Sequence, residues 1–201
     1  MVSRERRTVL ASRRRPVSAA AGVVLLGGAL SGCGLIGLPQ NKAAELSEWF
    51  PVSSLAFRDG QDLPTRYGCS SYPGGQSKTP PLHWTGKPTG TRSYAIVVDD
   101  PDADNGAYVH WVIAGIGENT QDLVEGTKID KTWVQGRNTG KKVGYEPPCP
   151  PRGEEHRYRF TIYALNDQAP FKPGATLKDS LGAIAKHTVG RGRITGNFGT
   201  E

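Results

Sequence analysis

The sequence predicts a mainly β domain of the α+β class, with antiparallel strands and a helix near the C-terminus packed on them. Three observations support this fold class. Short apolar segments rich in β-branched residues recur along the chain, and clusters of turn residues separate them. The 201 residues include 26 glycines and 15 prolines, which favour many turns over a bundle of helices. A convincing helical pattern follows only after the strands.

The expected strands come in a clear order. Two short candidates lie near Leu55–Phe57 and at Leu82–Trp84. Ser93–Val98 and Val109–Ile113 are nearly continuous apolar runs, a pattern typical of strands that are covered on both faces. Arg157–Leu165 alternates instead, so its apolar side chains share one face.

The expected helix begins after Thr176. Asp179 follows Thr176 by three residues, an arrangement related to the capping box with Asp in place of Glu. Leu177, Leu181 and Ile184 then recur at helical spacing on one face. We therefore expect a C-terminal helix whose apolar face packs on the strands.

The positive charge of the chain is concentrated at its N-terminus. Of the formal net charge of +6, residues 1–32 supply +5 through six arginines and one glutamate. A nearly neutral remainder argues against a nucleic-acid partner. Val17–Leu30 is apolar but shorter than the roughly 20 residues of a membrane-spanning helix, and it suits the core of a signal peptide.

The segment Leu30-Ser31-Gly32-Cys33 resembles the bacterial lipobox, in which the cysteine becomes the lipid-bearing N-terminus. We therefore predict a lipoprotein signal peptide at 1–32, lipidation at Cys33, a tether at 33–49 and one domain at 50–201. The lipid would anchor the protein to a bacterial cell membrane on the extracytoplasmic face. The alternative is a plain secretory signal in which Cys33 is incidental.

Three polar segments are candidates for chemistry. Asp99–Asp104 holds four carboxylates at the end of an expected strand, as a solvated turn or, less well, a calcium loop would. His110 lies inside the next strand. Glu146–Gly153 is a proline-rich and therefore rigid loop, and it would deliver His156 and Tyr158 to one face of a following strand.

The order of these motifs, DPDAD, then HW, then PPCPPRG and HRY, resembles the phosphatidylethanolamine-binding protein family, in particular its bacterial Raf-kinase-inhibitor-like branch. Phe57–Gly60, Tyr67–Cys69, Thr79–Trp84 and Gly196–Gly199 also resemble that branch, so the likeness covers about residues 50–199. It implies two antiparallel β-sheets with a C-terminal helix. It also implies a small surface pocket that holds phosphate-like anions and phospholipid headgroups.

The resemblance carries over to specific ligand-binding residues. The matching positions are Asp100, His110, His156, Tyr158, Pro150 and Pro151 in the pocket, with Asp102 and Trp84 in support. Imidazoles and a phenol can donate hydrogen bonds to phosphoryl oxygens, and a carboxylate can orient a histidine or raise its pKa. Three departures from the family pattern stand out: Asp104 adds a carboxylate at the rim, Pro147 removes a backbone donor, and His83 stands where the branch commonly has a small polar residue.

Export also bears on the cysteines. With Cys33 assigned to the lipid, Cys69 and Cys149 remain in turn segments of a protein that meets oxidising surroundings. We expect them to form a disulfide that ties the proline-rich loop down beside the pocket.

Three classes of function fit these features. The first is a binding protein for a small anionic or phosphorylated ligand, with no cofactor or resident metal and no catalytic activity. The second is an interaction module that inhibits a protease or binds another envelope protein. The third is a metal-assisted hydrolase using Asp100, His110 and His156, although these residues lack a metal-ligand spacing and no Ser or Cys nucleophile has a supporting motif.

Overall fold

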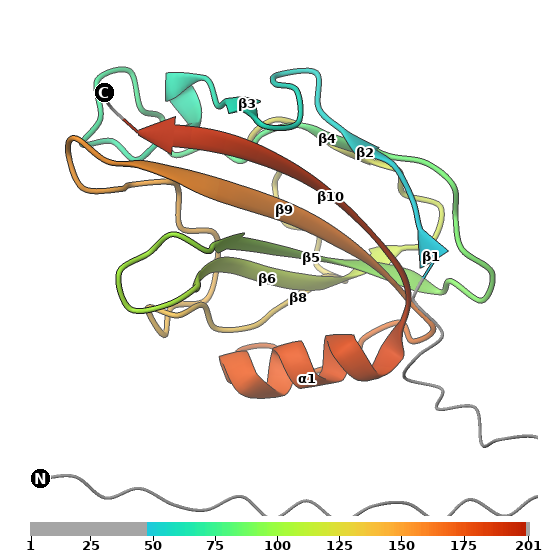
Figure 1. Cartoon of the computed structure of the whole chain (residues 1–201). Coiled ribbons are helices and arrows are strands. Elements are labelled where there is room, and N and C mark those ends of the chain that lie inside the picture. Colours follow the sequence, from blue (N-terminus) through green and yellow to red (C-terminus); the bar gives the residue numbers. More distant parts are fainter. Residues whose placement is uncertain (1–47, 200–201) are drawn as a thin grey trace, which may run out of the picture. The chain divides into compact units, whose positions relative to one another are not determined.

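Two β-sheets and one helix build the domain in the computed structural model, which describes residues 48–199 (Figure 1). The large sheet has seven strands in the order β1-β10-β9-β5-β6-β8, with β3 also paired to β10, and the small sheet has the order β2-β4-β7. The strands are β1 Glu48–Trp49, β2 Val52–Ser53, β3 Gln61–Asp62, β4 Leu82–Trp84, β5 Ser93–Asp100, β6 Tyr108–Gly117, β7 Asp122–Leu123, β8 Val134–Gln135, β9 Glu155–Leu165 and β10 Thr188–Gly199. The helix α1 spans Leu177–His187, and a 3-10 turn spans Thr65–Tyr67. The predicted fold class is therefore confirmed.

The predicted central strands are present and run antiparallel. β5 lies between β6 and β9, and all eight of its residues are buried, as a strand covered on both faces requires. It continues two residues beyond the apolar run, so Asp99 and Asp100 also lie within the sheet. The parallel pairs are the short strands β1 and β3 on β10.

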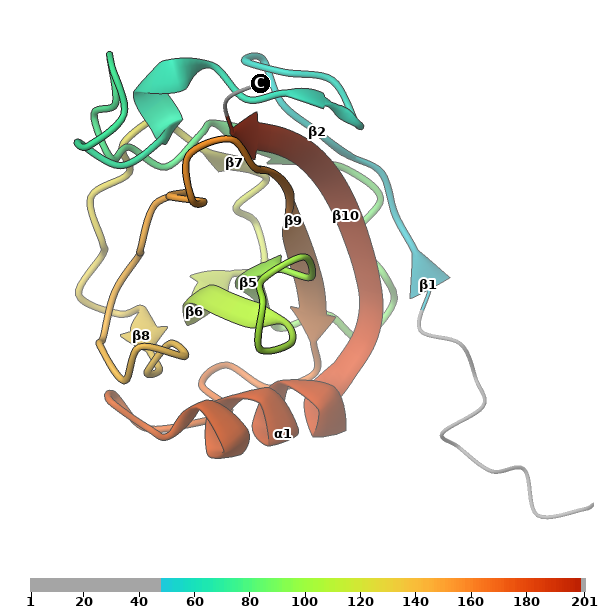
Figure 2. The ribbon, with the colours of Figure 1, turned by 60° about the vertical axis from the view of Figure 1, so that its left-hand side comes forward.

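The hydrophobic core has two layers, one on each face of the large sheet. The larger layer fills the space against the small sheet and includes Trp84, Trp111 and Phe160. The smaller layer lies between the large sheet and α1, where Ile184 packs with Val97 and other apolar residues. Figure 2 shows the helix running along this side of the sheet. The helix is capped as predicted, because the Thr176 Oγ1 accepts the backbone N–H of Asp179 at 3.2 Å.

The last strand, β10, has no counterpart among the predicted elements. Its glycines replace the alternating apolar residues that usually mark a strand. The chain that precedes β4 crosses this strand closely. A Cβ at Gly192 would lie 2.2 Å from the carbonyl oxygen of Phe50, and one at Gly196 would lie 2.6 Å from Leu63 Cδ2. Glycine is therefore required where these segments cross.

Two glycine substitutions, one at this crossing and one in α1, are expected to change stability in opposite directions. Gly192→Ala is expected to lower the free energy of unfolding by about 1–3 kcal/mol, because the clash is with backbone and forces a shift. Gly182→Ala, within the exposed face of α1 and with open space around it, is expected to raise that free energy by about 0.5–1 kcal/mol. Urea unfolding of both variants measures the difference. A Gly192→Ala variant as stable as the native protein would contradict the explanation of β10.

The predicted strand near Leu55–Phe57 is wrong. The chain bends there, Leu55 is exposed and Phe57 is buried in the core. The reason is local hydrogen bonding. The Ser54 hydroxyl accepts the N–H of Ala56 at 3.1 Å and donates to the carbonyl of Pro81 at 2.6 Å, which favours a turn over a strand ladder.

The first described residues already belong to the large sheet. Glu48 and Trp49, assigned to the tether, already pair with Gly190 and Arg191 of β10. The proposed signal peptide, Cys33 and the tether up to residue 47 lie outside the described residues. Within residues 48–199, no helix is long and apolar enough to cross a membrane.

Candidate ligand pocket

A pocket of about 360 Å³ lies at one end of the large sheet, where β5 ends and β6 and β9 begin. This end is on the left in Figure 1 and comes forward in Figure 2. Three loops complete it, and the lining residues are Asp100, Ala103, Asp104, Asn105, Gly106, Ala107, Tyr108, His110, Thr139, Glu146, Pro147, Cys149, Pro150, Pro151, His156 and Tyr158. The structure thus brings together Asp100, His110, His156, Tyr158, Pro150 and Pro151, which lie up to 58 residues apart in the chain.

His156 lies between two carboxylates. Its Nδ1 is 2.7 Å from Asp100 Oδ2, and its Nε2 is 3.1 Å from Glu154 Oε2. Burial alone would lower the pKa of His156, but the hydrogen bonds to Asp100 and Glu154 outweigh it and raise that pKa above its ordinary value. Both ring nitrogens face acceptors, so the doubly protonated imidazolium is the favoured form.

The Asp100 carboxylate is fixed by burial and by a second hydrogen bond. It is buried, and its second oxygen accepts the backbone N–H of Asp102 at 2.8 Å. β-Sheet pairing sets the geometry of the ion pair, since β5 and β9 are hydrogen-bonded neighbours in the large sheet. The Asp100 carboxylate therefore orients the His156 ring.

His110 has the opposite environment. Its ring lies against Tyr108 and Tyr158, and its Nδ1 donates to the backbone carbonyl of Glu146 at 2.9 Å. Burial lowers its pKa below the ordinary value despite the carboxylates nearby. The surroundings of His156 and His110 therefore shift the pKa values of these two histidines in opposite directions.

Tyr108 and Glu146 form a second polar group beside His110. The Tyr108 hydroxyl donates to Glu146 Oε2 at 2.8 Å, and Asn138 Nδ2 donates to the same oxygen at 3.2 Å. Burial, together with the Glu146 carboxylate, raises the pKa of Tyr108 to about 12, so the phenol stays protonated. Glu146 thus contributes its side chain to this wall and its carbonyl to His110.

Sequence reasoning missed this second group. Tyr108 could have been found, because it lies two residues before His110 in the same strand and so shares its face. Glu146 could not have been placed by periodicity, since it comes from an irregular loop. The loop 103–107 and Thr139 likewise enter the lining only through tertiary structure.

The two supporting residues, Asp102 and Trp84, do not line the pocket. Asp102 accepts the backbone N–H of Arg157 at 2.9 Å and pairs with its guanidinium at 2.6 Å, so it fastens the acidic loop to β9. The Arg157 hydrogen bond lowers the pKa of Asp102 to about 2. Trp84 also lies outside the lining. It is buried in β4, packed against Tyr94 with ring centroids 5.4 Å apart, and it belongs to the core between the sheets.

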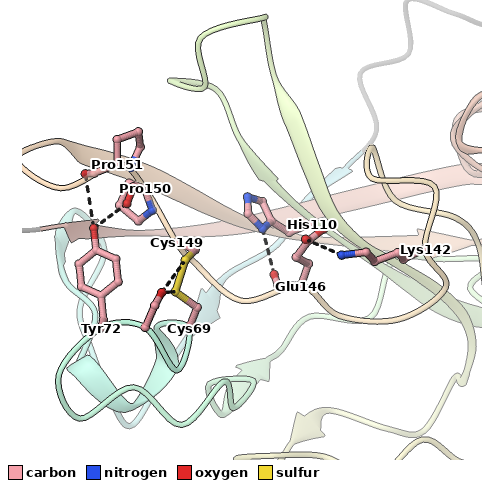
Figure 3. Close-up of a disulfide and its surroundings, with 9 residues drawn as sticks. Cys69, Tyr72, His110, Lys142, Glu146, Cys149, Pro150 and Pro151 are labelled. Atoms are coloured by element: carbon pink, nitrogen blue, oxygen red, sulfur yellow. Dashed lines mark hydrogen bonds and ion pairs between the residues drawn. A yellow bond between two sulfur atoms is a disulfide. The ribbon is translucent and has the colours of Figure 1, made fainter.

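The proline-rich loop is fastened to the rest of the domain by a disulfide. Cys149 is bonded to Cys69 in the structure, and the Tyr72 hydroxyl donates to the carbonyl of Pro150 at 2.7 Å (Figure 3). Proline restricts the backbone of the same loop. Three restraints therefore hold the wall formed by Pro150 and Pro151: the disulfide, the Tyr72 hydrogen bond and the rigidity of proline.

The charges around the pocket are unusual for an anion site. Three carboxylates line it, those of Asp100, Asp104 and Glu146, whereas neither lysine nor arginine is among the described lining residues. The exposed ammonium group of Lys142, which is not a lining residue, lies 3.5 Å from Glu146 Oε1. Within residues 48–199, no three or more His, Cys, Asp or Glu side chains are grouped so that they could hold a metal ion.

Comparison with known proteins identifies the fold. The chain matches the phosphatidylethanolamine-binding protein family model over residues 53–199. It is 38% identical over 151 residues to a UPF0098 protein of Methanothermobacter thermautotrophicus, covering 73% of this chain and 97% of that protein. It is also 38% identical over 159 residues to LppC of Mycobacterium tuberculosis, which is named as a lipoprotein, covering 77% of this chain and 75% of that protein.

Solved structures agree with the sequence relatives. The crystal structure of CT736 from Chlamydia trachomatis, described as a homologue of this family, aligns with a TM-score of 0.68 and 31% identity over 77% of this chain and 100% of that one. Escherichia coli YbcL, described as a member of the mammalian family, aligns with a TM-score of 0.69 and 29% identity over 76% of this chain and 99% of that one. The chain therefore belongs to the phosphatidylethanolamine-binding protein family.

Proposed function

We propose that this protein binds a small anionic or phosphorylated ligand in the pocket formed by Asp100, His110, His156 and Tyr158. The observation that carries the proposal is the state of His156. Its imidazolium presents an Nε2–H donor at the pocket edge, and a carboxylate oxygen of Glu154, whose side chain is half exposed, already accepts that donor. A phosphoryl oxygen has the same charge and acceptor character, so it can replace Glu154 there.

The polar groups of the pocket favour binding over catalysis. Cys149 is held in a disulfide, and the Thr139 hydroxyl accepts the backbone N–H of Val109 at 2.8 Å. The other ring nitrogen of His110, Nε2, has no hydrogen-bond partner in the described structure, so no lining hydroxyl or thiol is paired with it as a base. We therefore propose a binding protein without catalytic activity.

We also propose that the protein is anchored by a lipid on Cys33 at the extracytoplasmic face of a bacterial membrane. The lipobox-like segment supports this anchor, and a relative named as a lipoprotein adds to it. The disulfide between Cys69 and Cys149 is consistent with export, because disulfides persist in oxidising compartments.

The four histidines of the chain provide the test of ligand binding. In the full chain, inorganic phosphate or phosphoethanolamine is expected to shift the imidazole NMR signals of His110 and His156 at millimolar concentration or below. His83 and His187 lie outside the pocket lining and serve as controls within the same molecule. Unchanged His110 and His156 signals at millimolar ligand would contradict the proposal.

A further inference from the structure

The tautomer of His110 is set by its backbone partner. A carbonyl oxygen can only accept, so the 2.9 Å contact between Nδ1 and the Glu146 carbonyl places the proton on Nδ1. In the neutral ring, Nε2 then carries a lone pair and can only accept a hydrogen bond. Figure 3 shows this second nitrogen on the side of the ring away from Glu146.

That acceptor has no partner in the described structure. His110 is 6% exposed, and its Nε2 is buried without a hydrogen bond. Buried polar atoms are nearly always paired with protein, water or ligand. Because His110 lines the pocket, a ligand that carries a donor can pair with this atom.

Protonation of His110 is the alternative, and burial opposes it. The titratable or charged groups around the ring are Asp99, Asp100, Tyr108, Glu146, Tyr158 and, across Asp100, His156. The carboxylates favour a charged ring, but burial outweighs them and lowers the pKa of His110. Both tyrosines have raised pKa values and stay neutral.

The charge of the pocket adds an independent restriction. Three carboxylates line it without lysine or arginine among the described lining residues. Outside the lining, Lys142 pairs with Glu146 and Glu154 adds a fourth carboxylate beside His156, whose ring is the cation that faces the pocket. A dianion would meet strong repulsion there, whereas a monoanion can pair with His156 alone.

We propose that the pocket selects a phosphate monoester in its singly charged form, whose P–OH donates to His110 Nε2 while a charged oxygen accepts from His156 Nε2. This selection rests on the proposed ligand-binding function and narrows it. A phosphodiester has the same single charge but no P–OH, so it leaves His110 Nε2 unpaired. The headgroup phosphate of an intact phospholipid is such a diester.

Methyl phosphate and dimethyl phosphate test this selection in the full chain. At pH 5.5 both are mainly monoanions, and they differ in the P–OH donor. We expect methyl phosphate to bind at least about tenfold tighter in calorimetry, since an unpaired buried acceptor is costly. Because the second phosphate ionisation is near pH 6, raising the pH to 7.5 should weaken methyl phosphate about 25-fold relative to dimethyl phosphate.

Dimethyl phosphate also reports any titration of the protein, because it loses no proton over this range. Nitrogen-15 NMR of the complex should show His110 still neutral, with its proton on Nδ1. A His110→Phe variant, which keeps a ring but lacks the acceptor, should bind the two esters equally. If that variant fails to fold, the nitrogen-15 spectrum of the native complex still shows whether His110 is neutral with its proton on Nδ1.

Two results would overturn the inference. Equal affinity for the two esters, accompanied by an imidazolium signal from His110, would reject the monoester selection while leaving the proposed binding function intact. Failure of both esters and of inorganic phosphate to perturb either pocket histidine would reject the binding function and the selection together.

Discussion

Reduction of the disulfide between Cys69 and Cys149 is expected to lower the free energy of unfolding by about 4 kcal/mol. The two cysteines are 80 residues apart, and a crosslink that closes a loop of this length removes much of the entropy of the unfolded chain. Urea unfolding with and without reductant, in a full chain that carries Cys33→Ser, measures the effect. The Cys33→Ser background removes the third thiol, which could otherwise exchange with the pair.

Reduction of this disulfide should also loosen one wall of the pocket. Cys149 is a lining residue, and its neighbours Pro150 and Pro151 form one wall. After reduction, the hydrogen bond from Tyr72 to Pro150 remains, so the loop should loosen without detaching. A Cys69→Ala, Cys149→Ala variant that does not respond to reductant is the matched control. An unchanged urea midpoint on reduction of the native pair would show that the crosslink does not contribute to stability.

The central strands and the helix could be predicted because their side-chain patterns follow directly from burial. β5 is covered on both faces and is apolar from Tyr94 to Val98, whereas β9 alternates because one of its faces is partly exposed. The helix cap and its apolar face are local features, and both are found at the expected positions. Such elements need no knowledge of the residues that pack on them.

The edge of the large sheet could not be predicted in this way. β10 is glycine-rich because residues around Phe50 and Leu63 cross it, and neither crossing segment has a strand pattern of its own. β1 and β3 are two residues each and exist only as partners of β10. Their sequence requirements are set by distant backbone, which periodicity does not report.

The site likewise combines residues that motifs could place with residues that only the tertiary structure reveals. Asp100, His110, His156 and Tyr158 could be placed through recognisable motifs at strand ends, and these four do line one pocket. Trp84, carried over only as a supporting position, lies in the core between the sheets, because a motif position says nothing about which face of a short strand meets the core. Glu146 was missed because its role depends on a loop that folds back to put its carbonyl on His110.

The Asp100→Asn variant is expected to have the largest effect on the site. Asn keeps the size of the side chain and an oxygen for the Asp102 N–H, but it removes the charge that faces His156. Breaking a buried charge pair from one side costs about 3 kcal/mol or more of stability. The pKa of His156 should fall below its native, raised value, and phosphate binding should weaken at least tenfold because the imidazolium is lost.

The pH dependence distinguishes this explanation from simple damage to packing. A histidine whose pKa is raised on folding stabilises the native state fully below its unfolded pKa, near 6.5, and loses that contribution as the pH rises through the folded value. The difference in stability between the native chain and Asp100→Asn should therefore be larger at pH 6 than at pH 9. A packing defect would give a difference that does not change with pH.

Asp104→Asn is the matched control for this experiment. It removes one carboxylate from the same pocket, but Asp104 is exposed and His156 is paired with Asp100 and Glu154 instead. Its stability and its His156 titration should stay close to native, since exposed charges away from ion pairs contribute little. Equal losses of stability and equal shifts of His156 in the two variants would mean that the general negative potential of the pocket, rather than the Asp100 contact, sets the charge of His156. A loss confined to Asp100→Asn would assign that role to the single 2.7 Å contact at the end of β5.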